Sequence, residues 1–241
     1  TKNYGRVWKL DVTEETNDLK ALRLETKRLI QLSYPAQTNE MLYGLLSNQD
    51  QRIRRKAQFE LVERGKKGVP FLNNAAIQRD NQLARIHGIW GLGQLTRQHS
   101  SYGVSLIPLL NDSDPEIVAQ TAKVLGDARI QAASHKLITL LDHQHPHVQF
   151  FAAQALGRIA SVEAIQPLLK MLERNQDEDV YLRHSAVLAL SRIGQEAPIV
   201  ALSKSDNPSL RLAAVLVLRR LRSSKVSIFL KDRDELIATE A

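Results

Sequence analysis

The sequence predicts an all-α protein, a right-handed α-solenoid of about six and a half stacked helical hairpins. Three observations predict it: a leucine recurs at spacings of 28 to 34 residues, a small residue stands four positions before each leucine, and a helix-capping residue stands eleven before it. Self-similarity at this period is typical of stacked helical units. The recurring leucines are Leu61, Leu92, Leu125, Leu156, Leu190 and Leu218.

The small residues predict a buried stripe on one helix of every unit. Residues four apart share one face of a helix, so the leucine and the small residue point the same way. A small side chain on that face lets a second helix approach closely. The small residues are Ala57, Gly88, Thr121, Ala152, Ala186 and Ala214.

The capping residues predict where each of these helices begins. Asp and Asn side chains accept the unpaired N–H groups of a first helical turn. In three units the next residue is proline (Pro115, Pro146 and Pro208), which is tolerated at the first helical position. The predicted caps are Asp50, Asn81, Asp114, His145, Asp179 and Asn207.

A shorter apolar helix is expected before each cap, so that every unit is a helix, a tight turn and a helix. One unit cannot bury its apolar face alone, whereas stacked units form a continuous core. We expect this array over residues 37–241, with a seventh unit cut short at Ala241, and therefore a piece of a longer polypeptide. The expected first helices are Met41–Leu46, Val69–Ala76, Leu106–Leu110, Leu137–Leu141, Ile165–Leu172, Ile199–Leu202 and, in the seventh unit, Val226–Leu230 before the cap Asp234.

Four of the six units carry an arginine four residues after the cap. This order of a cap, two residues, an apolar residue and an arginine resembles the HEAT repeat, including the bilin-lyase-type HEAT-like repeat, over residues 37–241. The resemblance implies that each arginine pairs with the Asp column of a neighbouring unit, in a ladder interrupted at Val118 and Gln149. The ladder would comprise Asp50, Arg54, Asn81, Arg85, Asp114, Asp179, Arg183, Asn207 and Arg211.

Residues 1–36 differ from the array, and we expect them to be a strand-like segment and a helix that form the end of a preceding domain or a linker. Residues 4–12 suit a strand, and residues 18–32 return to helical spacing. The block Tyr4–Leu10 is similar to the last β-propeller strand of large bacterial proteins that join a sugar-dehydrogenase-like propeller, a HEAT array and a c-type cytochrome, and residues 85–92 resemble part of that array. This resemblance implies a periplasmic or secreted multidomain protein linked to oxidation or electron transfer. Its haem c would lie outside this chain, for which we expect no cofactor.

Composition and charge exclude several classes of protein. The chain is 43% hydrophobic and 24% charged, unlike a disordered or collagenous chain, and has no Cys for disulfides or thiolate metal sites. No apolar run reaches the ~18 residues of a membrane span. Residues 1–100 hold 17 basic and 10 acidic residues, whereas residues 101–241 hold 16 of each. Attraction to an acidic partner is therefore expected in the N-terminal half.

A basic surplus in residues 52–67 is the candidate partner-binding surface. Clustered cations attract phosphates or acidic proteins, although a solvated helix flank explains them as well. A nucleic acid would also stack on aromatic side chains, and Phe59 is the only one nearby. The candidate residues are Arg52, Arg55, Lys56, Arg64, Lys66 and Lys67.

Three closely spaced histidines are weak candidates for metal ligands. His143, His145 and His147 carry imidazoles that bind Zn²⁺ or Cu²⁺, but His145 occupies the cap column and no further inward ligand is marked. We therefore predict no metal site. We expect His87 to be partly buried and hydrogen-bonded, and Trp90 to lie in the core.

No catalytic constellation is found in this chain. Ser100 and Ser101 adjoin His99, but no nucleophile elbow or orienting acid accompanies them, and there is no Gly-rich phosphate loop. The sequence favours a non-catalytic scaffold that binds other domains or proteins. A nucleic-acid-binding protein that uses residues 52–67 and a bilin-lyase-like, chromophore-handling subunit remain alternatives; only the resemblance implies that a parent protein is an oxidoreductase.

Overall fold

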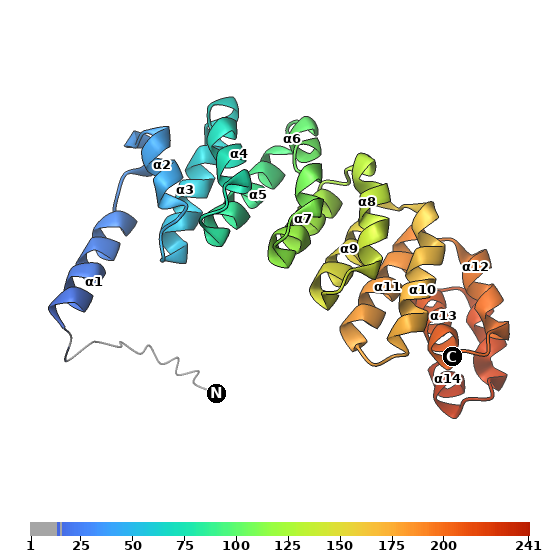
Figure 1. Ribbon diagram of the computed structural model, residues 1–241. Coiled ribbons are helices and arrows are strands. Elements are labelled where there is room, and N and C mark those ends of the chain that lie inside the picture. Colours follow the sequence, from blue (N-terminus) through green and yellow to red (C-terminus); the bar gives the residue numbers. More distant parts are fainter. Residues whose placement is uncertain (1–13, 15) are drawn as a thin grey trace, which may run out of the picture.

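The computed structural model describes residue 14 and residues 16–241, so the strand predicted over residues 4–12 lies outside the described part. Every regular element within the described part is a helix. The helices form an arched row that runs from α1 (Asn17–Ile30) to α14 (Glu235–Glu240), as Figure 1 shows. The all-α solenoid predicted from the sequence is confirmed.

The array is a succession of helical hairpins, each with an outer and an inner helix. The outer helices lie along the convex edge of the arch, and the inner helices lie on its hollow side (Figure 1). The outer helices are α2 (Asn39–Leu45), α4 (Val69–Ile77), α6 (Ser101–Val104) with η3 (Ile107–Asn111), α8 (Ser134–Thr139) with η5 (Leu140–Asp142), α10 (Ile165–Asn175), α12 (Glu196–Ala201) with η7 (Leu202–Lys204), and η8 (Ser224–Lys231). The inner helices are α3 (Gln51–Glu63), α5 (Gln82–Leu95), α7 (Pro115–Asp127), α9 (Pro146–Ile159), α11 (Val180–Ile193), α13 (Pro208–Leu221) and α14.

Several outer helices are wound more tightly than the sequence predicts. The helix expected at Leu106–Leu110 is the 3-10 helix η3, and the one expected at Val226–Leu230 is the 3-10 helix η8. Stretches of only a turn or two have few i→i−4 hydrogen bonds to gain, so tightening to i→i−3 bonds satisfies more of their backbone groups. The apolar positions of these stretches were predicted well, but their winding was not.

The predicted caps open the inner helices. The side chains of Asp50, Asn81, Asp114, Asp179, Asn207 and Asp234 each accept a first-turn N–H. His145 stands at the cap of α9, but its side chain makes no capping hydrogen bond; its own N–H donates to Nδ1 of His143. Pro146 begins α9 without needing an N–H partner.

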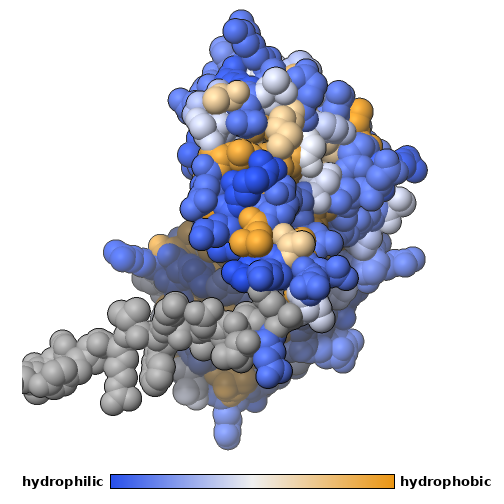
Figure 2. Space-filling view, turned by 90° about the vertical axis from the view of Figure 1, so that its left-hand side faces the viewer, coloured by the Kyte–Doolittle hydropathy of each residue, from blue (hydrophilic) through white to orange (hydrophobic). Residues whose placement is uncertain are grey.

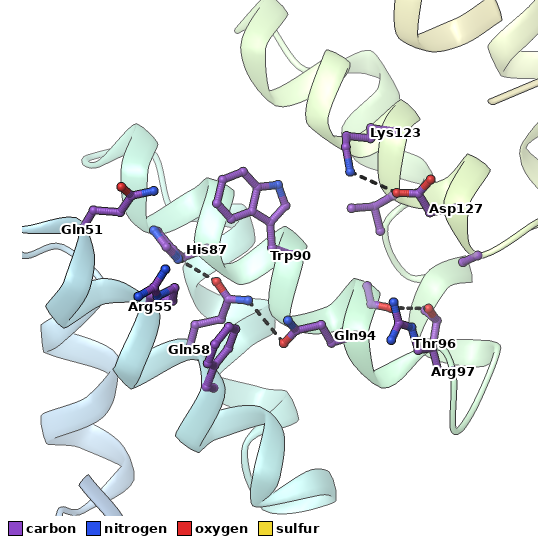
Figure 3. Close-up of a pocket in the computed structure, with 14 residues that line it drawn as sticks. Gln51, Arg55, Gln58, His87, Trp90, Gln94, Thr96, Arg97, Lys123 and Asp127 are labelled. Carbon is purple, nitrogen blue, oxygen red and sulfur yellow. Dashed lines mark hydrogen bonds and ion pairs between the residues drawn. The ribbon is translucent and has the colours of Figure 1, made fainter. Parts of the chain in front are cut away.

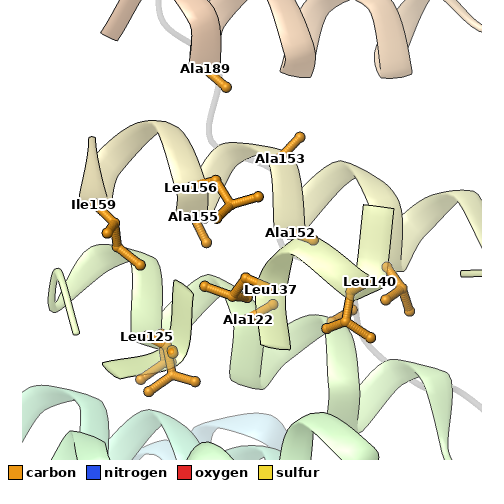
Figure 4. Packing of buried hydrophobic residues seen from close by; sticks show 14 of the residues in the cluster. Ala122, Leu125, Leu137, Leu140, Ala152, Ala153, Ala155, Leu156, Ile159 and Ala189 are labelled. Atoms are coloured by element: carbon orange, nitrogen blue, oxygen red, sulfur yellow. The ribbon is translucent and has the colours of Figure 1, made fainter. Parts of the chain in front are cut away.

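The recurring leucines form one continuous core. All six are at most 2% exposed, and the six small residues four positions before them are also buried. Figure 4 shows the pattern at one step of the array, where Leu125 and Leu156 of successive inner helices lie close to Leu137 of the outer helix between them. Each hairpin therefore buries its leucine against its neighbours, as expected for a solenoid.

Glycines set the distance between successive inner helices. A Cβ on Gly126 of α7 would lie 2.5 Å from Cα of Ala155 in α9, and one on Gly157 of α9 would lie 2.6 Å from Cα of Ala189 in α11. The backbones of α7, α9 and α11 therefore touch at these points. Each glycine directly follows its recurring leucine, and each alanine directly precedes the leucine of the next unit.

Two arginines of the predicted ladder reach the next hairpin. Nη2 of Arg85 lies 2.5 Å from Oδ2 of Asp112, and Nε of Arg211 lies 2.9 Å from Oδ2 of Asp232. These acceptors differ from the predicted Asp column, because each stands two residues before a cap rather than at it. The cap carboxylates, such as that of Asp114, already accept N–H groups of the first turn.

The other two arginines bind within their own hairpin. Arg54 donates to the carbonyl of Asn48, and Arg183 pairs with the carboxylate of Asp177. At the predicted interruption, Gln149 takes the same role by donating to the carbonyl of His143. In each case the acceptor lies six residues earlier, in the turn between the helices. In these three units, the residue four positions after the cap therefore closes the turn of its own hairpin.

The first turns of α1 stand apart from the array. Leu29 near its end is buried, but Leu19 and Leu22 are 57% and 55% exposed. The apolar face predicted for residues 18–32 is therefore covered only at its C-terminal end by the described residues. Seen from the end of the molecule nearest α1, the surface is mainly hydrophilic, with apolar residues in small separate patches (Figure 2).

We expect Gly157→Ala to destabilise the array, because the new Cβ would meet the backbone of α11. Overpacking of this kind costs about 1–3 kcal/mol of unfolding free energy, which urea denaturation measures. The matched control is Gly44→Ala in α2, where nothing lies within 4 Å of the new Cβ. The control should gain about 0.8–1.0 kcal/mol from helix propensity. Equal losses in both variants would contradict the close approach.

We expect Arg211→Ala to lower the unfolding free energy by about 3–5 kcal/mol, because it leaves the carboxylate of Asp232 buried without its counter-charge. The side chains of this pair are 4% and 5% exposed. Arg233→Ala is the control, since Arg233 and its partner Asp206 lie at the surface. Thermal and urea unfolding should give the control the same unfolding free energy as the wild type. An equal loss of unfolding free energy in both variants would show that the Arg211–Asp232 pair does not stabilise the end of the array.

Candidate binding pocket on the inner face

A pocket of about 350 Å³ opens between the inner helices α3, α5 and α7 (Figure 3). Five of the residues that line it stand two positions before or after a recurring leucine. These are Phe59 of α3, Trp90 and Gln94 of α5, and Lys123 and Asp127 of α7. One helical turn separates the two positions, so both face the hollow side of the arch.

A single side chain explains why the pocket opens at this step of the array. The position filled by Ala155 and Ala189 at the following steps holds Val124 between α5 and α7. A Cβ on Gly93 of α5 would first meet the side chain of Val124, at 2.6 Å, rather than its backbone. The larger valine keeps the two helices further apart than α7 and α9, and the pocket lies in that space.

A buried hydrogen-bond chain forms one wall. Nδ1 of His87 lies 2.6 Å from Oε1 of Gln58, and Nε2 of Gln58 donates to Oε1 of Gln94 at 3.3 Å. A carbonyl oxygen only accepts, so in this arrangement the proton of His87 is on Nδ1. The amide nitrogen of Gln94 makes no hydrogen bond to the described residues and lines the pocket as a donor.

His87 is neutral at ordinary pH. Burial, and next the charge of Arg54, lower the pKa of His87 from 6.5 to about 4. His87 is only 3% exposed, which confirms the expectation of a buried, hydrogen-bonded histidine. A neutral imidazole is the form that fits the hydrogen bond to Gln58.

Trp90 is half-buried in the pocket wall, rather than fully in the core as predicted. Its Nε1 donates to Oε1 of Gln120 at 2.9 Å, and Gln120 donates to Glu116 at 2.7 Å. Glu116 in turn lies 3.2 Å from Nδ1 of His147 on α9. A buried indole N–H needs a polar partner. Its partner Gln120 lies on the face of α7 that borders the space between α5 and α7.

The charges at the pocket are unevenly compensated. Lys123 pairs with Asp127 at 3.0 Å, and Asp127 also pairs with Arg158 at 3.1 Å. Arg55 and Arg97 are exposed and make no side-chain hydrogen bond or ion pair with the described residues. The rim therefore carries two cations that are available to an anionic group.

Half of the predicted basic residues make contacts within the chain instead. Arg52 pairs with the cap carboxylate of Asp50, and Lys56 donates to the carbonyl of Ile30. Arg64 donates to the carbonyls of residues 34, 35 and 37 and to the side chain of Asn39, which ties the segment after α1 to the first hairpin.

The three remaining cations do not form one patch. Arg55 stands near the start of α3, whereas Lys66 and Lys67 follow its end. A helix of this length separates them by about 15 Å. Residues 52–67 therefore hold two small basic sites, of which one is at the rim of the pocket.

The histidine cluster is used for local contacts. Nδ1 of His143 accepts the N–H of His145, and His147 points towards Glu116. Within the described residues there is no group of three or more His, Asp or Glu side chains placed to hold a metal ion. Burial, followed by the charge of His145, lowers the pKa of His143.

The pocket residues Gln58, Gln94, Lys123 and Asp127 were missed by sequence reasoning. Gln94, Lys123 and Asp127 each stand two residues before or after a recurring leucine, so the repeat already predicted which helix face they occupy. The signal that a pocket would form there was Val124, which stands in the column that holds Ala155 and Ala189 at the next two steps and Val217 at the last. Its effect on helix spacing follows only from the packing.

The comparisons with known proteins agree with this fold. Residues 104–181 match the family model of HEAT repeats. The chain is similar to the CpcE–CpcF phycocyanin lyase from Nostoc (20% identity, TM-score 0.52, 86% of this chain and 88% of that chain). It is also similar to YibA of Escherichia coli (18% identity, TM-score 0.52, 93% and 84%). These likenesses show a helical-repeat fold.

A third similar structure is an engineered protein (20% identity, TM-score 0.51, 84% of this chain and 66% of that chain). Comparison with curated proteins finds no match. None of the described helices has the length and hydropathy needed to cross a membrane.

We expect the stability of the protein to fall as the pH is lowered from about 6.5 to about 4. The pKa of His87 is lower in the folded chain than in the unfolded one, so unfolding takes up a proton in this window. Full stability is present above pH 6.5, and the contribution of His87 lost by pH 4 is about 3 kcal/mol.

The measurement is the difference in urea unfolding free energy between the wild type and His87→Asn from pH 4 to 7.5. Asn keeps a hydrogen-bond donor for Gln58 but does not titrate. All other titratable groups are the same in the two proteins, so their contributions cancel in the difference. A pH-independent difference would contradict the assignment. His87→Ala should lower the melting temperature at pH 7, because it removes both the packing and the hydrogen bond.

Proposed function

We propose that this chain is a non-catalytic interaction scaffold that binds a segment of a partner protein along its inner face, with the pocket at Trp90 as the anchor. The observation that carries the proposal is the pocket itself. It combines an aromatic wall, an unpaired amide donor and two uncompensated arginines on a surface that the array leaves open.

The chemistry of the walls suits a polypeptide. Phe59 is 51% exposed and, with Trp90, offers apolar surface to a large side chain of a partner. The amides of Gln51 and Gln94 match the donors and acceptors of a peptide backbone. Arg55 at the rim adds attraction for a nearby carboxylate. Protein interfaces are typically anchored by such aromatic residues in preformed pockets.

The same lining does not support catalysis. Its hydroxyl group, on Thr96, donates to the carbonyl of Gly93, and its carboxylate, on Asp127, is held between Lys123 and Arg158. The side chain of His87 is directed to Gln58 and has no nucleophile within hydrogen-bond distance among the described residues. A nucleophile and a base in contact are the minimum for acyl transfer.

The alternative functions have less support. A nucleic-acid interface over residues 52–67 would need one continuous basic patch, and Arg52, Lys56 and Arg64 are bound within the chain. The likeness to phycocyanin lyase is one of fold, which gives no pocket residue a role with a pigment. That structure is itself a complex of two chains, in line with an interaction role. Membership of a periplasmic or secreted protein linked to electron transfer rests on the resemblance of residues 4–10 and 85–92.

The test is selection of a random peptide library on the immobilised protein. Enriched peptides should carry a large apolar residue and bind the wild type about ten-fold more tightly than Trp90→Ala, as expected for a buried aromatic anchor. Binding to each variant is followed by the fluorescence anisotropy of a fluorescein-labelled copy of the enriched peptide.

Ile77→Ala is the matched control. Ile77 lies on the outer helix α4 and is 63% exposed, so its removal should leave the affinity unchanged. The proposal fails if Trp90→Ala binds the enriched peptides as tightly as the wild type does, or if Ile77→Ala weakens them as much. It also fails if no peptide is enriched.

A further inference from the structure

A column of arginines crosses the inner face beyond the pocket. The residue two positions after the recurring leucine is Arg158 in α9, Arg192 in α11 and Arg220 in α13. The same position holds Gln94 in α5 and Asp127 in α7. Because α9, α11 and α13 pack in succession, the three guanidinium groups stand on neighbouring helices at the same height. We name Arg158, Arg192 and Arg220 the arginine column.

The arginine column is mostly uncompensated. Arg158 pairs with Asp127 at 3.1 Å and donates to Gln154 at 3.2 Å. Arg192 and Arg220 are exposed, and their side chains have no acceptor among the described residues. Burial, and next the charges of Arg158 and Arg220, lower the pKa of Arg192. The three cations therefore repel one another in the free protein, and a bound anion would relieve that repulsion.

The surface beside the column is concave. Arg158 and Arg192 line a cleft of about 450 Å³ with Asp127 and Arg129. Arg220 lines a second cleft, of about 580 Å³, whose other walls include Phe150, Tyr181 and Leu216. An occupant would thus meet positive charge along one side and apolar side chains next to it.

We propose that the arginine column binds an acidic segment of a protein partner in an extended or polyproline II conformation. Adjacent packed helices lie about 8–10 Å apart. Three residues of a polyproline II helix span about 9 Å, so carboxylates at every third residue would meet successive arginines. Arginine is suited to this role because its planar fork binds a carboxylate through two parallel hydrogen bonds.

The neighbours of the column favour a polypeptide over a nucleic acid. One helical turn before the three arginines stand Gln154, Leu188 and Leu216. None of these three side chains is aromatic. The rings of the second cleft, Phe150 and Tyr181, stand near the starts of α9 and α11, about two to three helical turns from the arginine of the same helix. Single-stranded nucleic acids are held by rings beside the cations as much as by charge. Aliphatic side chains instead suit the apolar residues that separate the acids of a peptide.

This site is distinct from the pocket at Trp90. The two lie on the same inner face and meet at Asp127, which pairs with Lys123 at the pocket and with Arg158 in the column. Binding at the column does not require Trp90, and binding at the pocket does not require Arg192 or Arg220. Each proposal can therefore fail alone.

The experiment uses fluorescein-labelled peptides with glutamate at every third residue and proline and alanine between. Fluorescence anisotropy at low ionic strength (about 50 mM) should show binding that weakens as salt is added. A peptide with glutamine in place of glutamate should bind about ten-fold more weakly. The double variant Arg192→Gln, Arg220→Gln should lose about ten-fold in affinity for the glutamate peptide, whereas Trp90→Ala should retain it.

The matched control is Lys204→Gln, Lys231→Gln, which changes the net charge equally on the exposed outer elements η7 and η8. It should retain the affinity of the wild type. A second design tests for a gain of binding. The double variant Arg192→Glu, Arg220→Glu should bind a peptide that carries lysine in place of each glutamate. A misfolded protein would not gain this binding.

Three outcomes would overturn the proposal. The first is no binding of the glutamate peptide by the wild type. The second is an equal loss in the lysine control, which would indicate attraction by net charge alone. The third is tighter, column-dependent binding of single-stranded oligothymidylate than of the peptide, which would assign the column to nucleic acid.

Discussion

The shared apolar interior of adjacent hairpins is the constraint on which the rest of the structure depends. A leucine such as Leu125 is buried only because the hairpins on both sides cover it, so no unit is stable alone. The small residues on the same stripe let the covering helices come close. Caps such as Asp114 begin each inner helix at the right residue, and arginines such as Arg211 close the turns. These local features agree with one another, which is what allows the repeat to specify the fold.

The size of the residue directly before each recurring leucine decides where a pocket opens between the inner helices. Ala155 and Ala189 accept the backbone of a glycine from the preceding helix, and there the inner helices touch. Val124 holds α5 away from α7, and the pocket at Trp90 lies in the space. A change of two methyl groups in the core thus has an effect on the surface, since close-packed interiors transmit differences in volume to their boundaries.

The two sets of arginines have opposite roles. Those near the start of the inner helices are buried or half-buried and bind turn carbonyls or carboxylates, as Arg85 binds Asp112. Arg192 and Arg220, near the ends of α11 and α13, are exposed and have no partner among the described residues. Net charge alone does not reveal which cations are available. Lys56 and Arg64 in the basic half are bound to backbone carbonyls, whereas the electrically balanced half keeps Arg192 and Arg220 without an acceptor among the described residues.

The sequence by itself determined the solenoid, the hairpin register, the buried leucines and the helix starts, because these depend on contacts that recur at short spacing and on local capping chemistry. It also placed His87 correctly inside. The pocket, the acceptors of the ladder and the 3-10 winding of η3 were decided only by the tertiary structure. Helix spacing depends on how two side chains from different hairpins meet, and the partner of a long arginine depends on which acceptors the caps have already taken. Neither can be known from one hairpin alone.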